Sequence, residues 1–108
     1  MKSFDDLIQS YLAADLDPGI VHAWYQTHTP SDETLSALAE NIGAGFLAGE
    51  INFTAANGLL NDLMPIVGFE AAPRRFWQYY VAFEDFETSK SPDSDARSAV
   101  AVLVGGAT

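Results

Sequence analysis

The two histidines, His22 and His28, are the first residues to consider for metal or acid–base chemistry. Helical zinc pairs place their ligands on one face, four residues apart, whereas these two lie six apart. The chain has no cysteine, which excludes thiolate ligands, disulfides and a thiol nucleophile. We therefore expect no metal site and no cofactor, and both histidines are interpreted as solvated or capping residues.

Adjacent carboxylates occur at Asp5-Asp6, Asp32-Glu33 and Glu84-Asp85. Neighbours on a helix diverge by about 100°, so such a pair does not converge on one proton or one metal ion. None of the three pairs lies in an EF-hand loop, and no nucleophile elbow surrounds a serine. Because no acid–base constellation emerges, we predict that the protein is not an enzyme.

The stretch GAGFLAG, from Gly43 to Gly49, resembles a dinucleotide-binding loop only superficially. Its last glycine comes one residue too late, and no strand precedes it. The stretch lies inside a helical pattern, so we expect the glycines to let a neighbouring helix approach and Gly49 to end the helix. Arg74-Arg75, at the start of a later helix, could hold an anion there, but pairing with the surplus acids is favoured.

Negative charge is the strongest global feature of the chain. Fifteen acidic residues face five basic ones, for a net charge of −10. Residues 1–73 contain ten of the acids and a single base, Lys2, whereas residues 74–108 contain five acids and four bases. Such a surface repels phosphate backbones, which argues against direct nucleic-acid binding, and attracts a basic protein partner. The alternative is that the charge serves solubility alone.

Start signals and apolar stripes predict helices throughout the chain. Ser3 is expected to cap a first helix that ends near Asp15, and Asp17-Pro18 begins a second. Thr29-Pro30-Ser31 opens a third helix. A fourth is predicted from about Phe53 or Thr54 to Val67, with Pro65 expected to kink or stop it.

Pro73 is expected to start a fifth helix, and Ser91-Pro92 opens a last segment over residues 92–104, which Gly105-Gly106 stops. We predict a helix there, although the alternation in VAVLV also permits a short strand. The fold class predicted from these signals is all-α, with five or six short helices in an antiparallel, bundle-like packing. With 108 residues, the chain is expected to form a single helical domain over residues 1–108.

The aromatic stretch FWQYYVAFEDFE occupies residues 76–87. At 100° per residue, five of its rings share one arc and are expected in the core: Phe76, Tyr79, Tyr80, Phe83 and Phe86. Gln78, Ala82 and Asp85 point away from that arc. Trp77 lies at its edge beside Glu84, where it either anchors a partner or packs under a neighbouring helix. The candidate partner-binding residues are therefore Asp32, Glu33, Trp77, Glu84, Asp85 and Glu87.

The N-terminus lacks the apolar run of a signal peptide, and no stretch approaches the ~18 uncharged apolar residues of a membrane span. These features predict a cytoplasmic protein that does not bind membranes.

Two stretches carry a family resemblance. GFLAGEINFTAANGLLNDLMPIV, residues 45–67, reads as a helix end, a Gly-Glu turn and a second amphipathic helix, and FWQYYVAFEDFE follows as an aromatic helix with an acidic end. Together they resemble small acidic helical bacterial immunity proteins of the colicin D immunity type, over about 40 residues and without a signature motif. The glycine-rich third helix and the apolar C-terminus depart from that pattern. The resemblance implies a protein that blocks the active site of a basic toxin nuclease with carboxylates.

The sequence thus favours a non-enzymatic, acidic protein-binding module, in the immunity case an inhibitor of a basic toxin. The alternative is a structural or self-associating helical subunit, for instance a homodimer, that uses Trp77 and the apolar C-terminus.

Overall fold

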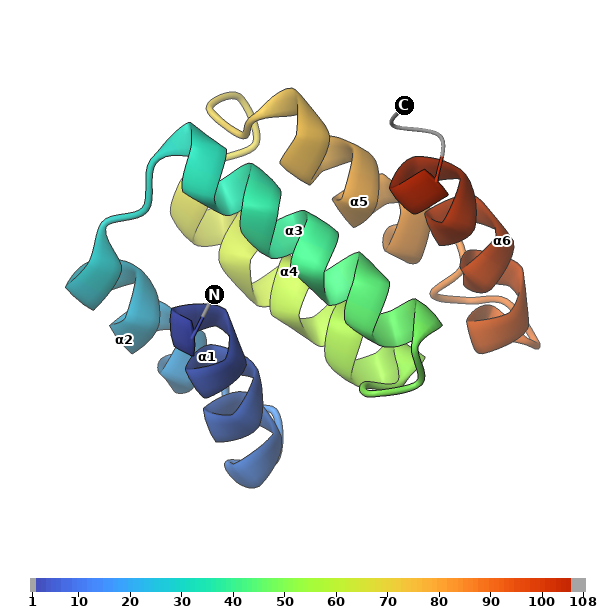
Figure 1. Ribbon diagram of the computed structural model, residues 1–108, viewed down its shortest axis with the longest axis horizontal. Helices are drawn as coiled ribbons and strands as arrows, with labels where there is room; N and C mark the ends of the chain where they lie inside the picture. Colours follow the sequence, from blue (N-terminus) through green and yellow to red (C-terminus); the bar gives the residue numbers. More distant parts are fainter. Residues whose placement is uncertain (1, 106–108) are drawn as a thin grey trace.

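All regular elements in residues 2–105, which the computed structural model describes, are α-helices (Figure 1). Their bounds are α1 (Lys2–Ala13), α2 (Pro18–His28), α3 (Asp32–Leu47), α4 (Phe53–Val67), α5 (Arg74–Glu84) and α6 (Pro92–Gly105). The predicted all-α fold is confirmed, with six helices and no strand in this part of the chain. The VAVLV segment is therefore helical. Gly106, predicted to help stop α6, lies outside the described residues.

Side-chain caps set the start of three helices. Asp17 caps α2, Ser31 caps α3 and Asn52 caps α4, each accepting a hydrogen bond of 2.9–3.2 Å from a backbone N–H in the first turn. The first helix differs from its prediction, because α1 already contains Ser3 and ends at Ala13. It ends early because the next turn takes positive φ angles, at 56° and 62° for residues 15 and 16.

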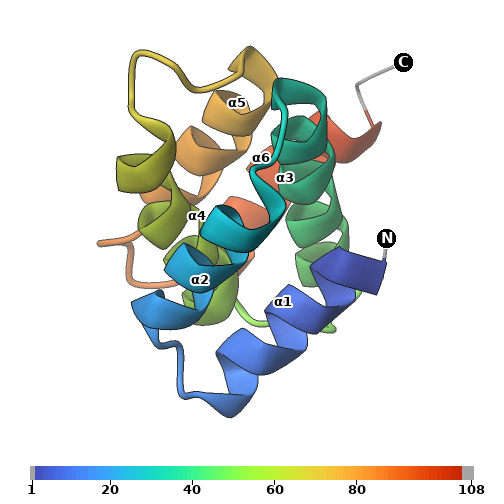
Figure 2. The ribbon, with the colours of Figure 1, turned by 90° about the vertical axis from the view of Figure 1, so that its left-hand side faces the viewer.

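The helices are arranged in pairs, with one pair at the centre and one further pair on each side of it. Antiparallel α3 and α4 occupy the centre, with α1 and α2 on one side and α5 and α6 on the other (Figures 1 and 2). Consecutive helices reverse direction, as predicted for an antiparallel bundle. The radius of gyration of 12.7 Å is close to the ~13 Å expected for a compact chain of this length.

The neighbouring helices α3 and α5 run in the same direction. Glu40 lies against Arg75, and one turn later in both helices Gly43 lies against Tyr79. A Cβ atom added at Gly43 would lie only 2.5 Å from Cε1 of the Tyr79 ring. The predicted role of this glycine in close helix approach therefore agrees with the packing of α3 on α5.

A cluster of aromatic rings fills the core between α3, α4 and α5. Phe46 and Phe83 meet edge to face at 5.1 Å between centroids, and Phe53 lies 5.9 Å from Phe83. Of the five rings predicted inward on the fifth helix, the four that lie on α5 are buried, and Phe86, which follows the end of α5, is half-buried. Ala82, predicted to point away from the core, is buried instead, because α6 packs beside it.

Gly49 ends α3 as predicted. Its φ of 78° lies in the left-handed region that favours glycine. The N–H groups of Gly49 and Glu50 return to the carbonyls of Phe46 and Gly45, at 3.1 and 2.9 Å, which is the Schellman pattern of a helix C-terminus. This turn leads the chain directly into α4.

Candidate functional site

The six residues predicted as partner contacts fall on two different helices. Asp32 and Glu33 occupy the first turn of α3 and are exposed. Trp77 and Glu84 are exposed on α5, and the exposed Asp85 and Glu87 follow its last turn. The structure thus groups the four later candidates at one helix and leaves the two earlier ones on another.

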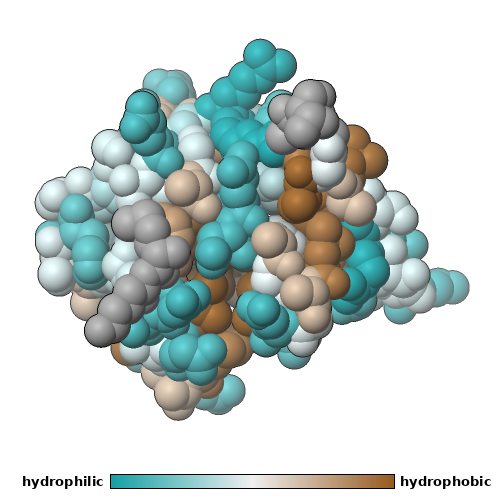
Figure 3. Space-filling model, in the orientation of Figure 1, coloured by the Kyte–Doolittle hydropathy of each residue, from teal (hydrophilic) through white to brown (hydrophobic). Residues whose placement is uncertain are grey.

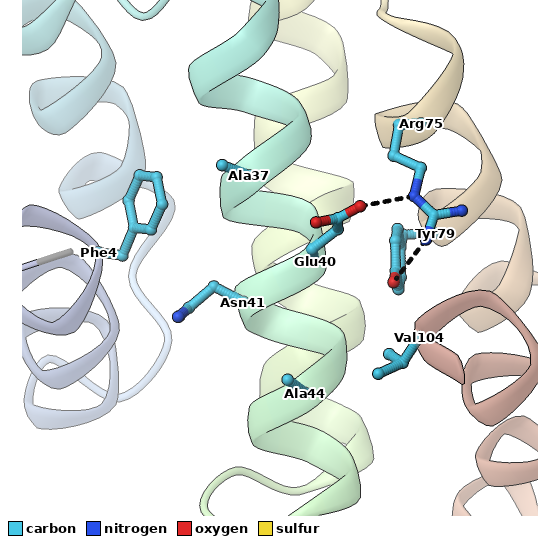
Figure 4. Close-up of a pocket in the computed structure, with 8 residues that line it drawn as sticks. All are labelled: Phe4, Ala37, Glu40, Asn41, Ala44, Arg75, Tyr79 and Val104. Atoms are coloured by element: carbon cyan, nitrogen blue, oxygen red, sulfur yellow. Dashed lines mark hydrogen bonds and ion pairs between the residues drawn. The ribbon is translucent and has the colours of Figure 1, made fainter. Parts of the chain in front are cut away.

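The exposed face of α3 forms the floor of a groove, which we call the α3 groove. It consists of two adjoining depressions of about 430 and 330 Å³ that share Asn41 and Ala44. Figure 4 shows the first of these, with Phe4 of α1 on one side and Arg75, Tyr79 and Val104 of α5 and α6 on the other. Apolar side chains gather over α6 and between α1 and the second half of α3 (Figure 3).

Small side chains make up most of the floor. Ala37, Asn41, Ala44 and Ala48 line the two depressions and follow one another at spacings of four, three and four residues. That spacing keeps them on one face of the helix. Because three of the four end at Cβ, another backbone can approach α3 closely along this face.

Carboxylates border the α3 groove along its length. Glu40 lines the first depression, and Asp5 and Glu50 line the second. Glu33, a predicted contact residue, lies one turn before Ala37 on the same face of α3 but does not line either depression. Within the described residues, Asp5 and Glu50 make no ion pair.

Among the lining residues that the structure describes, Arg75 is the single cation, and it is held in place. Its Nε donates to the Glu40 carboxylate at 2.8 Å, and one terminal nitrogen donates to the Leu103 carbonyl at 2.5 Å. Its guanidinium also lies over the Tyr79 ring, 5.1 Å from the centroid. Burial raises the pKa of Tyr79 above its ordinary value; Arg75 opposes the shift and Glu40 adds to it. The hydroxyl therefore stays neutral, and the remaining charge among the described lining residues is negative.

The second surface is an aromatic cluster, formed by Phe69, Trp77 and Tyr80. Trp77 stacks on Tyr80 at 5.5 Å between centroids, and Phe69 meets both rings edge to face. Phe69 and Trp77 are 56% and 41% exposed, so the cluster presents ring surface to solvent. Burial raises the pKa of Tyr80, and the neighbouring carboxylates of Glu84 and Glu87 raise it further. Aromatic surface and acids thus adjoin here.

Sequence reasoning missed the groove residues Asp5, Glu40, Asn41, Ala44 and Glu50. The sequence feature that could have indicated this groove is the presence of alanines, spaced along the polar side of α3, where long charged side chains are usual. Phe69 was also missed, because it lies in the link between α4 and α5, outside any helical stripe.

Neither histidine takes part in a metal-binding arrangement. His28 places Nδ1 3.0 Å from the Trp24 carbonyl, and His22 places Nε2 3.0 Å from the Gln26 amide nitrogen. Over residues 2–105 no group of three histidine or acidic side chains could hold a metal ion. In the same range, no helix is long and apolar enough to cross a membrane.

Comparison of the chain with protein families, with curated proteins and with solved structures found no match.

Proposed function

We propose that the chain is a non-enzymatic protein-binding module whose α3 groove takes a basic helical segment of a partner protein. The observation that supports this most is the combination of a floor of small side chains with carboxylate borders along α3. A floor of this kind suits a second backbone, and the borders suit its cationic side chains.

The dimensions of the groove favour a short helix as the bound segment. Ala37 and Ala48 are eleven residues apart, which is about 16 Å, or three helical turns. An amphipathic helix would lay its apolar face on the alanines, as helices do in other grooves. Lysine or arginine residues on its flanks would then reach Asp5 and Glu50, which make no ion pair within the described residues.

The uneven charge of the chain gives the second line of support. Residues 1–73, which include the α3 floor and the whole α1 wall, carry ten acids and one base. A field of one sign over a groove raises the rate at which an oppositely charged partner arrives, and dissolved salt weakens it. The charge would then act mainly on association.

The resemblance to immunity proteins supplies one concrete partner of this class, a basic toxin nuclease. Its cationic active-site surface would meet the carboxylates of the groove. The other candidate function is a self-associating helical subunit, which the exposed rings of Phe69 and Trp77 favour.

A pair of matched substitutions tests the groove. Ala44 lines both depressions, so Ala44→Arg would fill the floor while keeping a residue that favours helix. Gln26→Arg adds the same charge at an exposed position of α2 and serves as the control. Each full-length variant is immobilised and exposed to a lysate of the source organism, after circular dichroism has verified its fold.

We expect the original chain and Gln26→Arg to retain the same basic protein, and Ala44→Arg to bind it at least about tenfold more weakly. Equal retention by the two arginine variants would place the contact elsewhere and refute the groove as the binding site.

A further inference from the structure

Four residues share the outer face of α5. Arg74 is its first residue, Trp77 and Val81 lie in its middle, and Glu84 is its last. At 100° per residue they fall within an arc of about 80°. Arg74 and Glu84 are exposed, Trp77 is 41% exposed and Val81 is half-buried. The face therefore has a cation at one end, an anion at the other and apolar surface between.

The order of these residues is symmetric about Tyr79. Arg74 and Glu84 each lie five residues from it, and Trp77 and Val81 each lie two residues from it. A two-fold rotation that sets two α5 helices antiparallel therefore brings Arg74 opposite Glu84 of the second copy. The same rotation brings Trp77 opposite Val81. The face is complementary to itself, as a two-fold interface requires.

The charges on α5 are reversed with respect to its own dipole. Its first turn has no acid and contains Arg74, and its last turn has no base and ends in Glu84. Each charge disfavours the isolated helix, because the N-terminus is the positive end. In an antiparallel pair, each charge would instead lie over the opposite end of the other helix, where it is favourable. Arg74 also makes no ion pair within the described residues, whereas Arg75 and Arg97 both do.

We propose that a second copy of this chain docks on this face, with the two α5 helices antiparallel and crossing at the level of Tyr79. Trp77 borders an apolar groove of about 320 Å³, whose other lining residues include Val81, Ala99 and Leu103. The second copy's Trp77 would face Val81 and enter this groove. Charge fits this occupant, because each copy brings one cation, Arg74, and one anion, Glu84, to the face, and the two-fold rotation pairs them.

The proposed contact leaves the α3 groove open. Arg75 and Tyr79, which line that groove, lie on the side of α5 away from Trp77 and Val81. The dimer would therefore present two α3 grooves, and its existence does not depend on what they bind.

Sedimentation velocity of the full chain over ~1–300 µM tests the proposal, because a contact centred on one face of a three-turn helix should associate in the micromolar range. We expect a concentration-dependent dimer. Arg74→Glu and Glu84→Arg, made singly, should each weaken it at least about tenfold by opposing like charges. Both substitutions agree with the helix dipole, so α5 should remain folded. The double variant restores the opposite charges and should dimerise again.

Two further variants complete the test. Lys90→Glu makes the same charge change as Arg74→Glu outside α5 and should leave the dimer intact. Trp77→Ala should weaken it at least about tenfold by removing the central apolar contact. A chain that stays monomeric throughout the concentration range overturns the proposal. So does a dimer that the single charge reversals leave unchanged, or a double variant that fails to recover. Binding of only a basic lysate protein to this face would assign it to a different partner and equally overturn the proposal.

Discussion

Replacing Gly43 with alanine adds a methyl group where α3 and α5 are closest. The new Cβ would lie 2.5 and 3.0 Å from two carbons of the Tyr79 ring, and 3.3 Å from Cγ1 of Val100. The ring is fully buried and lies beneath the Arg75 guanidinium, so it has little room to move away. Overpacking of this kind costs about 1–3 kcal/mol. Alanine returns about 1 kcal/mol through its better helix propensity, so we expect a net loss of about 0–2 kcal/mol.

Gly45→Ala is the matched control in the same helix. Its Cβ would have Glu50 Oε2 as nearest neighbour, at 3.7 Å, which is ordinary van der Waals contact. Only the propensity gain then remains, and we expect stabilisation by about 0.5–1 kcal/mol. Because the propensity gain is common to both variants, they should differ in the free energy of unfolding by the overpacking cost alone, which is at least about 1 kcal/mol.

Urea denaturation followed by far-UV circular dichroism measures this difference. In thermal melts, 1 kcal/mol corresponds to about 4–8 °C for a domain near this size. If Gly43→Ala is as stable as Gly45→Ala, the close approach of α5 to α3 is wrong. The position of Arg75 and Tyr79 in the α3 groove would then be wrong with it.

Two other predictions concern the core and the alkaline limit of stability. Phe46→Ala and Phe83→Ala should each lower the free energy of unfolding by about 3–5 kcal/mol. A double-mutant cycle should show about 0.5–1.5 kcal/mol of coupling between these two rings. An unchanged melting temperature would mean that the substituted ring faces solvent. Burial, and then the 2.7 Å hydrogen bond to Asp62, raise the pKa of Tyr11 in the folded state. As the pH rises, the Tyr11 hydroxyl ionises in the unfolded chain before it ionises in the folded protein. The contribution of Tyr11 to the free energy of unfolding is therefore complete below about pH 10 and is lost as the pH rises above it. The urea midpoint should therefore fall more between pH 9 and 11 in the original chain than in Tyr11→Phe, and an equal fall in both would contradict the assigned burial.

Local chemistry made much of the fold predictable. Asp17 and Ser31 indicate helix starts, and Gly49 indicates a helix end. These signals can be read from the sequence because each residue caps or turns the backbone within a few residues of itself. The inward arc of α5 followed from its periodicity alone. The prediction that Ser3 caps the first helix was wrong, because a serine gives the same sequence signal whether it precedes a helix or lies within its first turn.

Packing between distant elements was not predictable. By periodicity, Ala82 belongs to the outward arc of α5. It is buried because α6, which follows later in the chain, packs beside it. Nothing in the neighbourhood of Gly43 indicates that Tyr79, 36 positions later, needs its space.

The candidate site was predictable in its charge but not in its shape. The acid surplus of residues 1–73 can be counted directly, and the edge position of Trp77 follows from its angle on the helix. The α3 groove, in contrast, depends on walls from α1, α5 and α6 that only folding brings together. Ala44 by itself resembles any small residue on an exposed helix face.

The most direct test of the central claim is the association rate of the captured basic partner, measured in rising salt. If the carboxylates along the α3 groove steer that partner, its association rate should fall at least about tenfold between ~20 and ~500 mM salt, because the screening length shortens over this range. Ala44→Arg should associate slowly at every salt concentration, whereas Gln26→Arg should follow the original chain. A rate that stays flat from low to high salt would show that the negative charge serves only solubility, and would contradict the proposed function.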